Sequence, residues 1–397
     1  MRILHVIPSL AERDGGPPKA AIEMCRELVR RGHKAEIYTT NVDGDGYLDL
    51  PLQRPVAFRG VNVTYFPVNG DNYYKLSFSM SAALRKNIER FDVVHIHYLY
   101  HFPSAVAAHH CRKHGVPYIV QPHGSLVPYI YKRRALRKRL YEALIERRNL
   151  TAAAAALFTT AEEMSLANSS GLSFRGAVVP LGVDLEARKD GAENAADVFW
   201  PELVGRKVLL FLGRIHPVKA LDLLARAFGA IRRAHADAHL VIAGPDTDGY
   251  AAQVRRWLAE VGALDATTFT GMVVDAKKAA LLVRANLFVL PSYTENFGIA
   301  AVEAMAAALP IVISNRVNIW REIEAARAGL VASPDSRELA KAMLALLENP
   351  ALAKEMGACG QRMAREQFSW RAAGDQLVQL YRSIHGEKPP MFAKDPR

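Results

Sequence analysis

Short apolar runs rich in β-branched residues alternate along the whole chain with longer segments whose apolar residues recur at helical spacing. In the first half, the short runs predict strands at Ile3–Ile7, Ala35–Thr39, Val61–Phe66, Val93–Ile96 and Tyr118–Val120. Helical patterns lie between several of these strands, at Pro18–Arg31, Phe78–Arg90 and Ser104–Lys113. Gly32 follows the first of these helices, where a glycine at the C-terminal cap is typical.

The second half repeats the alternation. Its apolar runs predict strands at Val208–Leu212, Leu240–Ala243, Leu287–Leu290 and Ile311–Ser314. Its helical patterns lie at Leu221–Arg233, Tyr250–Val261, Ala276–Arg284, Ile299–Ala308 and Ser336–Leu347. Because strands that are apolar on both faces and separated by helices form parallel sheets covered by helices, the sequence predicts an α/β fold.

Two sets of strand–helix units in a chain of 397 residues predict two doubly wound domains. The boundary is expected between Pro180 and Arg206, because Arg188–Asp197 (RKDGAENAAD) is polar and has no apolar period. We therefore assign residues 1–185 to the first domain, 186–206 to a linker and 207–369 to the second domain. A last helix at residues 370–386 is expected to cross back to the first domain.

The composition narrows the class of protein. Half of the residues are hydrophobic and 23% are charged, which excludes a disordered or fibrous chain. The three cysteines are few and odd in number, so we expect a reducing compartment rather than a disulfide framework. No run of ~20 apolar residues exists to span a membrane, and the apolar run before Pro8 is too short for a signal peptide. We expect a cytoplasmic protein.

The net charge of +11 lies mainly in the first half, where residues 1–180 hold 24 Lys and Arg against 15 Asp and Glu. The densest basic run is Tyr131–Arg148, with eight cations and two acids. Its apolar residues lie at helical spacing, at Leu136, Leu140, Leu144 and Ile145. One interpretation is a helix packed by this stripe with a solvated basic face. The other is peripheral contact with an anionic membrane through Lys132–Arg148. Nucleic acid is not an expected partner, because no recognised binding motif accompanies the charge.

Two loops after predicted strands of the second domain carry candidate chemistry, because ligands of doubly wound sheets bind outside the carboxyl ends of the strands. After Val208–Leu212 come Arg214 and Lys219, just before a helix. The N-terminal end of a helix is itself positive, so two cations beside it are unfavourable unless an anion binds there. After Leu287–Leu290 comes Glu295, and Glu303 follows inside an alanine-rich helix, where a buried carboxylate needs a partner or a ligand. The alternative for Arg214 and Lys219 is a pair of solvated surface charges, and the alternative for Glu303 is a partly exposed helix residue.

Two weaker signals lie in the first domain. Gly15-Gly16 follows the first predicted strand and would let the backbone approach a ligand closely, although a simple tight turn explains the pair equally well. His123-Gly124 follows the strand at Tyr118–Val120, so a functional histidine and a structural one are both open.

Six short motifs follow one another in a characteristic order. They are Gly15-Gly16; His123-Gly124; Pro180-Leu181-Gly182-Val183-Asp184; Gly213-Arg214 with Lys219; Phe269-Thr270-Gly271; and Pro291-Ser292 with Glu295, Phe297-Gly298 and Glu303-Ala304-Met305. This order resembles glycosyltransferase family 4, whose members are retaining, GT-B-fold enzymes that use nucleotide-sugars. The resemblance covers nearly the whole chain, and its most specific element is the pair of glutamates with seven residues between them.

The resemblance implies a GT-B architecture, in which two Rossmann-like domains face each other across a donor and acceptor cleft. It implies that Arg214 and Lys219 hold the donor diphosphate and that Glu303 accepts hydrogen bonds from the ribose. Glu295 would contact the transferred sugar, and His123 would meet this sugar from the first domain. We therefore expect Glu295, His123, Arg214 and Lys219 to act in catalysis.

Backbone groups complete the implied donor site. The amides of Asn296, Phe297 and Gly298 would bind the sugar and the phosphate, while Gly15 and Gly16 would lie against the phosphate from the first domain. Asn296 stands where family members often have glycine, which bears on the choice of donor. The donor would be UDP- or GDP-linked and would serve as substrate, with no separate cofactor. Retention by same-face attack, with the leaving phosphate as base, needs no protein nucleophile.

Metal sites are the competing interpretation of two kinds of motif. Asp43-Gly44-Asp45 and Asp246-Thr247-Asp248 have metal-binding spacing, but Asp and Gly are typical of turns, so we expect no metal there. Seven of the thirteen histidines lie between His95 and His123, and His95 and His97 would share one face of a strand. A zinc site, the lining of an acceptor site and plain surface are the alternatives for this cluster.

Three functions remain open. The favoured one is a glycosyltransferase that builds surface polysaccharide on a lipid-linked glycan acceptor. The second is a GT-B-fold isomerase or a synthase of a soluble disaccharide. The third is a non-catalytic nucleotide-sugar binder, which the cationic pair and the paired glutamates disfavour.

Overall fold

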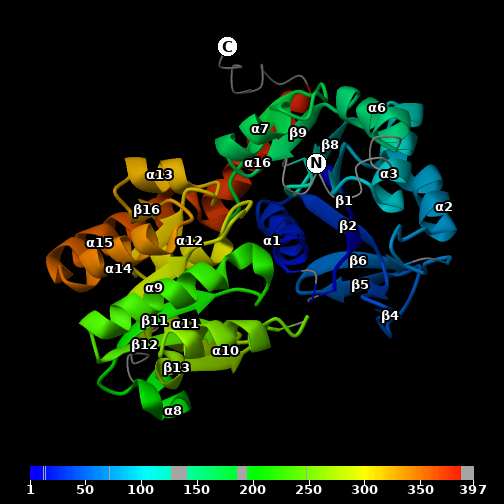
Figure 1. The fold of residues 1–397 in the computed structure, drawn as a ribbon. Helices are drawn as coiled ribbons and strands as arrows, with labels where there is room; N and C mark the ends of the chain where they lie inside the picture. The colour runs from blue at the N-terminus through cyan, green and yellow to red at the C-terminus, as the bar shows by residue number, and fades with distance from the viewer. Residues whose placement is uncertain are drawn as a thin grey trace. The chain divides into compact units, whose positions relative to one another are not determined.

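The computed structural model describes residues 1–11, 13, 15–70, 72–126, 141–185, 195–246 and 248–385. The chain folds into two compact units, which Figure 1 shows as ribbons. The first unit takes in Met1–Gly182 and Trp370–Arg397, and the second is Val183–Ser369. The chain leaves and re-enters the first unit at neighbouring points, since the Val183 amide donates to the Phe368 carbonyl at 2.7 Å.

Within the described residues the first unit has an eight-stranded sheet in the order β10-β9-β8-β7-β1-β2-β6-β5. The strands are β1 (Arg2–Ser9), β2 (Lys34–Thr40), β5 (Pro55–Phe58), β6 (Val61–Phe66), β7 (Val93–His97), β8 (Tyr118–Gln121), β9 (Ala155–Phe158) and β10 (Gly176–Val178). The expectation of a parallel sheet is wrong at one edge, where β5 pairs antiparallel with β6. The cause is a two-residue turn at Arg59-Gly60 with φ of 50° and 81°, the geometry of a tight hairpin.

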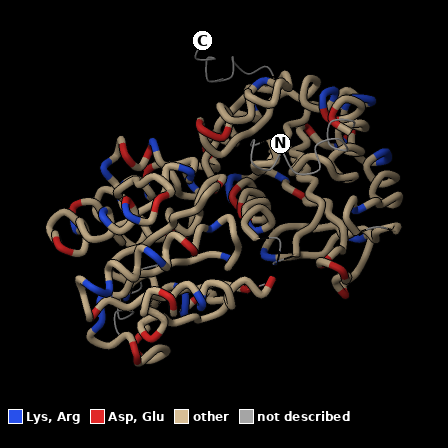
Figure 2. The backbone as a smooth tube through the Cα atoms, in the orientation of Figure 1, with Lys and Arg blue, Asp and Glu red and all other residues tan. Residues whose placement is uncertain are grey.

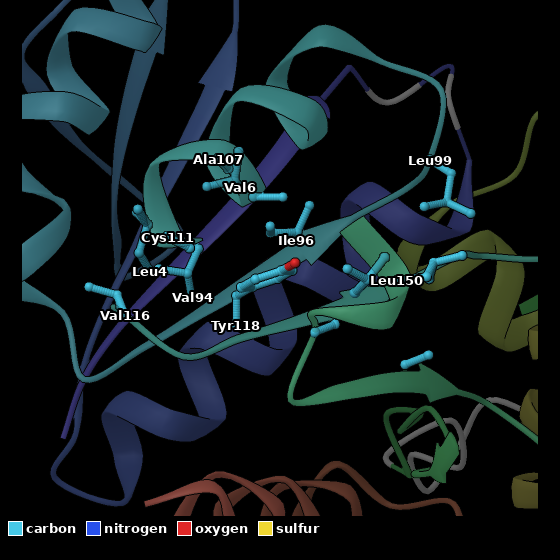
Figure 3. Close-up of a cluster of buried hydrophobic side chains, with 14 of the residues drawn as sticks. Leu4, Val6, Val94, Ile96, Leu99, Ala107, Cys111, Val116, Tyr118 and Leu150 are labelled. Carbon is cyan, nitrogen blue, oxygen red and sulfur yellow. The ribbon is translucent and has the colours of Figure 1, made fainter. Parts of the chain in front are cut away.

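Helices cover both faces of this sheet. They are α1 (Gly16–Arg30), α2 (Phe78–Asn87), α3 (Phe102–His114), α6 (Arg147–Thr151), α7 (Ala161–Asn168) and α16 (Trp370–Ile384). Figure 3 shows the core beneath α3, where Leu4 and Val6 of β1 lie beside Val94 and Ile96 of β7 and all four are 0–1% exposed. Because side chains alternate across a strand, the residues between them point to the opposite face, which α1 and α16 cover.

The second unit has, in its described residues, a six-stranded sheet in the order β13-β12-β11-β14-β15-β16, and every pair in it is parallel. Its strands are β11 (Lys207–Leu212), β12 (Ala238–Ala243), β13 (Thr267–Gly271), β14 (Leu287–Leu290), β15 (Ile311–Ser314) and β16 (Leu330–Ala332). Its helices are α8 (Ala195–Phe199), α9 (Leu221–Ala234), α10 (Ala251–Glu260), α11 (Asp275–Arg284), α12 (Ile299–Ala306), α13 (Trp320–Ala325), α14 (Ser336–Leu347) and α15 (Pro350–Gln367).

The basic run is described only in its last part, because residues 127–140 lie outside the described residues; most of Lys132–Arg148 is therefore not placed. A π-helix at Glu142–Glu146 leads into α6. Of the expected apolar stripe, Leu136 and Leu140 lie outside the described residues, Ile145 is partly buried, and Leu144 departs from the expectation because it is 70% exposed. Glu146 is buried instead and accepts hydrogen bonds from the Tyr100 amide at 2.7 Å and from Asn149 Nδ2 at 3.1 Å. The extra residue in a π-turn shifts the helical register, and these partners satisfy the buried carboxylate.

None of the helices in the described ranges is long and apolar enough to cross a bilayer. Figure 2 shows Lys and Arg interspersed with Asp and Glu on the surfaces of both units.

Candidate functional site

Each sheet has one place where the strand order reverses. In the second unit it lies between β11 and β14, because β12 and β13 follow on one side and β15 and β16 on the other. In the first unit it lies between β1 and β7. Ligands of doubly wound sheets bind outside the carboxyl ends of the strands at such a switch point. The loops that follow these four strands are therefore where a site is expected in each unit.

The loop after β11 is packed tightly against the end of β12. The Gly213 amide donates to the Ala243 carbonyl at 2.9 Å. Only glycine fits at position 244, because a Cβ there would lie 2.0 Å from the Gly213 carbonyl oxygen. Lys219 folds back over this loop, with its Cε 3.8 Å from the place of a Cβ on Gly213. The loop thus holds Lys219 against its backbone, while the Arg214 side chain is exposed.

The loop after β14 is tied to the loop after β11. The Tyr293 amide donates to the Val218 carbonyl at 2.8 Å, and the Glu295 amide donates to a carbonyl of the loop after β15 at 3.0 Å. Gly298 precedes α12 with φ of 81°, and a Cβ there would lie 2.9 Å from Val317 Cγ1. This position therefore needs glycine for both conformation and space.

Asn296, Phe297 and Gly298 form the entry to α12. The Phe297 side chain is 2% exposed and packs edge-to-face on Phe368, with ring centroids 5.5 Å apart. Its side chain therefore belongs to the core, and only its backbone is available to a ligand. The first amides of a helix have no intrahelical acceptor, so the start of α12 offers N–H donors to an anion or a sugar oxygen.

Two lysine–glutamate pairs bring the charged residues of this site together. Lys219 Nζ donates to Glu295 Oε2, and the two side chains are 15% and 20% exposed. Lys278, on α11, donates to Glu303 Oε1 at 2.8 Å, and the Glu303 side chain is 11% exposed. Each carboxylate is thus desolvated beside a cation, and a ligand with phosphates and hydroxyls can exchange partners with both pairs.

In the first unit the candidate residues lie at two strand ends. Gly15, with φ of 84°, caps the N-terminus of α1, and Gly16 is the first residue of that helix. Pro17 and Pro18 follow in the first turn and lack an N–H, so Gly16 is the main amide donor there. His123 follows β8 with φ of 50°, and its Nε2 lies 2.9 Å from His97 Nδ1. Burial, and to a lesser extent the nearby His95, lowers the pKa of His123 to about 3, so the ring is neutral near pH 7.

Sequence reasoning missed three residues that support these groups. Lys278 could have been noticed, because Lys277 and Lys278 open a helix after a strand end just as Lys219 does. Glu163 could not have been noticed, because it lies about forty residues from the His123-Gly124 turn. Its Oε1 accepts a hydrogen bond from the Gly124 amide at 2.9 Å. His5 could not either, because only the sheet order brings β1 beside β7.

The aspartates of the two candidate metal motifs lie at turns or at the start of a helix. Asp43 and Asp45 lie in a tight hairpin between β3 (Val42–Asp43) and β4 (Gly46–Tyr47). The Asp246 carboxylate accepts the Tyr250 amide at 2.8 Å and so starts α10. The expectation that His95 and His97 share a face is confirmed, since their rings stack with centroids 4.4 Å apart. Plain surface is wrong for them, because both are fully buried.

Three known proteins resemble this chain in sequence. The D-inositol 3-phosphate glycosyltransferase of Stackebrandtia nassauensis is 27% identical over 92% of this chain and 86% of its own length. The phosphatidyl-myo-inositol mannosyltransferase of Mycobacterium leprae is 32% identical over 52% of this chain and 53% of its own length. The mannosylfructose-phosphate synthase of Agrobacterium fabrum is 33% identical over 44% of this chain and 40% of its own length. The match spans about half or less of the last two relatives.

Two solved structures share the fold over nearly their full length. HepE from Anabaena, in complex with UDP and glucose, superimposes with a TM-score of 0.77 at 17% identity, covering 96% of this chain and 100% of that one. Sucrose-phosphate synthase from Thermosynechococcus elongatus gives a TM-score of 0.75 at 20% identity, covering 98% and 100%.

Family models match both units. The model for a glycosyl transferase 4-like domain matches residues 15–182, and the model for glycosyl transferases group 1 matches residues 196–363. The chain therefore belongs to the group 1, family 4-like glycosyltransferases and has their GT-B fold of two Rossmann-like domains.

Proposed function

We propose that this chain is a retaining glycosyltransferase that moves a sugar from a UDP- or GDP-linked donor to a lipid-linked glycan in surface polysaccharide biosynthesis. The observation that carries the proposal is the pair of lysine–glutamate contacts at the switch point of the second unit. Charged groups held partly out of water at this place suit a ligand that carries both phosphate and hydroxyl groups.

The donor would take over the partners that these residues now give one another. Its diphosphate binds Lys219, the exposed Arg214 and the amides at the start of α12. Glu303, beside Lys278, accepts hydrogen bonds from the ribose hydroxyls. Glu295, released from Lys219, accepts hydrogen bonds from the hydroxyls of the sugar that is transferred.

Transfer then breaks the bond between the anomeric carbon and the phosphate oxygen. The electron pair leaves on the diphosphate, whose growing charge is stabilised by Arg214 and Lys219. The acceptor hydroxyl attacks the same face of the sugar and passes its proton to the leaving phosphate oxygen. Because cations and helix amides meet the phosphate charge, the proposal needs no metal ion and no protein nucleophile.

A groove of about 640 Å³ in the first unit supports a lipid-linked acceptor. Its lining includes apolar residues of three segments together with Arg112 and Arg148, a combination that fits a hydrocarbon chain ending in a phosphate. Leu144, on its rim, is 70% exposed, and Phe78 at the start of α2 is 63% exposed. Exposed apolar side chains near cations suit docking on an anionic membrane surface. The Mycobacterium leprae relative is named for a phospholipid acceptor, which favours the same class.

A soluble acceptor is the second candidate. It is favoured by the match of 33% identity with mannosylfructose-phosphate synthase and by the shared fold with sucrose-phosphate synthase. A transferase of this kind would act on a sugar phosphate in solution and would need no membrane.

The test is a thermal-shift panel of nucleoside diphosphates and nucleotide-sugars, beginning with UDP, the nucleotide bound in the Anabaena structure. A ligand that binds only the folded chain at 100 times its Kd stabilises it by about 2.7 kcal/mol. Transfer of the selected donor is then measured with anionic membrane extract and with soluble sugar phosphates. Transfer only to the soluble acceptors would reject the lipid-linked proposal, and no shift with any nucleotide would reject donor binding.

A further inference from the structure

Four histidines from β1, β7 and the loop after β8 gather on one side of the first sheet. His5 of β1 is in register with His95 of β7, and His97 lies two residues further along the same face of β7. His97 is in register with Gln121 at the end of β8, so His123 follows two residues beyond that position. The topology thus brings these rings together at the switch point between β1 and β7.

Three of the rings form a hydrogen-bonded chain that ends at the site. His5 Nδ1 lies 2.9 Å from His97 Nε2, and His97 Nδ1 lies 2.9 Å from His123 Nε2. His5 and His97 are fully buried, whereas His123 is partly exposed. His95 braces the chain from the side: it stacks on His97 with an interplanar angle of 9°, and its Nδ1 lies 2.8 Å from the Tyr381 hydroxyl of α16.

The environment keeps these rings neutral. Burial lowers the pKa of His5 and of His97 well below the usual range, and the neighbouring histidines lower both further. A neutral imidazole has one N–H donor and one acceptor nitrogen. In a chain of such rings, the proton position on one ring therefore decides the proton position on the next.

The buried end of the hydrogen-bonded chain of rings determines which nitrogen of each ring donates. His5 Nε2 has no hydrogen-bond partner among the described residues and is shielded from water. Orphaned N–H groups are rare in protein interiors, so this nitrogen is best left without a proton. His5 then donates from Nδ1 to His97 Nε2, and His97 donates from Nδ1 to His123 Nε2. The proton of His123 is left on Nδ1, the nitrogen that His97 does not occupy.

The His123 backbone supports a functional reason for this arrangement. Its φ of 50° is in the left-handed region, as is the φ of 66° at Tyr98, whose ring centroid lies 4.8 Å from that of His123. Non-glycine residues in this region are strained and persist where the surroundings hold them in place. Here the neighbouring rings hold the His123 side chain.

A metal ion fits these rings less well than the hydrogen bonds do. The described side chains that could share one there are His5, His95 and His97, all fully buried. This set contains no carboxylate, so no charge of these side chains would offset that of a divalent ion. Binding it would also break the His5–His97 contact, which already has hydrogen-bond length.

We propose that His97, and His5 behind it, are positioning residues that fix the ring and tautomer of His123, so that His123 presents an N–H donor from Nδ1 to the sugar substrate. This inference rests on the proposed function, with His123 meeting the transferred sugar as the sequence analysis expects. It assigns His123 the role of a hydrogen-bond donor, in keeping with a reaction in which the leaving phosphate takes the acceptor proton.

The direct test is NMR of protein labelled with ¹⁵N in its histidine rings, with signals assigned by single substitutions. We expect the proton of His123 on Nδ1 in the unmodified chain, and a mixture of tautomers in His5→Phe and His97→Gln. The control is His114→Gln, on α3, whose ring pairs with Glu89 outside this cluster. A proton on Nε2 of His123, or a His123 signal unchanged in both variants, would overturn the proposal.

Two substitutions at His97 separate positioning from mere packing. The amide of asparagine can stand in for Nδ1 and keep a donor toward His123, while that of glutamine stands in for Nε2 and loses it. We expect His97→Gln to lower kcat by about tenfold with the KM for the donor unchanged, and His97→Asn to restore most of the rate. Equal losses in both variants would overturn the positioning role.

Three further outcomes remain distinct. Stoichiometric zinc in protein purified without chelator, lost in His95→Ala, would overturn the hydrogen-bonded chain. The expected tautomers in a protein that transfers no sugar would reject the proposed function and the role toward substrate, while the hydrogen-bonded chain stands. Sugar transfer by a protein whose His123 carries its proton on Nε2 would reject the positioning proposal alone.

Discussion

Glu295→Gln is expected to strengthen the binding of a nucleoside diphosphate while it weakens sugar transfer. Glu295 holds Lys219 in an ion pair whose side chains are 15% and 20% exposed, so screening by water is incomplete. A diphosphate must displace this carboxylate before it can use the lysine. Breaking such a half-buried pair, and leaving its negative charge near the phosphates, costs about 1–2 kcal/mol, or about 5- to 30-fold in Kd. Glutamine removes this cost.

The same substitution removes a charged acceptor from the sugar. A hydrogen bond to a charged group contributes about 1.5–3 kcal/mol, so single-turnover transfer should fall by roughly 10- to 100-fold. Calorimetric titration with the diphosphate and a rapid-quench transfer assay measure the two effects separately. Glu338→Gln, an exposed glutamate of α14, is the matched control. Diphosphate binding that weakens in Glu295→Gln would refute the competition between carboxylate and phosphate.

Four other predictions follow from the same structure. Arg214→Ala should weaken diphosphate binding without disturbing an ion pair among the described residues. Glu303→Ala should weaken nucleotide-sugar binding more than turnover. Titration and single-turnover rates check both predictions, and unchanged affinities would contradict them. Burial lowers the pKa of His95 in the folded chain to about 3, whereas in the unfolded chain its pKa is near 6.5. The unfolded chain alone therefore binds a proton here as the pH falls below about 6.5, so the free energy of unfolding decreases from about pH 6.5 toward about pH 3. The loss is about 2 kcal/mol at about pH 5, and urea unfolding should show a smaller pH dependence in His95→Gln; an equal dependence would count against it. Binding to anionic vesicles should weaken as the salt concentration rises from about 0.1 M to about 1 M. It should be lost, while transfer to soluble acceptors is kept, when glutamine replaces Arg133, Arg134, Arg137 and Arg139. Co-sedimentation measures the binding, and replacement of Arg255 and Arg256 of α10 is the control.

The sequence predicts what depends on local pattern. The central strands, β1 and β7 in the first unit and β11 and β14 in the second, are buried on both faces and stand out as continuous apolar runs. The glycine at position 298 is required by a left-handed backbone and by Val317, two constraints that a local motif preserves. For this reason the loops of the second unit can be recognised from the order of their residues alone.

What the sequence does not predict depends on contacts between distant segments. β5 is an edge strand with alternating burial, and its antiparallel pairing follows from one tight turn. The π-turn before α6 shifts the helical register by one residue, so Leu144, one residue of the expected apolar stripe, is exposed. The pairing of Lys278 with Glu303 joins two helices, and that of His5 with His97 joins two strands, so neither leaves a local pattern.

The most direct measurement is the anomeric configuration of the product formed from a panel of UDP- and GDP-sugars, read by NMR and mass spectrometry. The chain is incubated with each donor, with membrane extract and with soluble sugar phosphates in separate reactions. We predict release of one nucleoside diphosphate for each sugar transferred to an acceptor from the membrane extract, with the anomeric configuration of the donor retained, and loss of transfer in Lys219→Ala. An inverted product, or no transfer from any donor to either class of acceptor, would contradict a retaining glycosyltransferase.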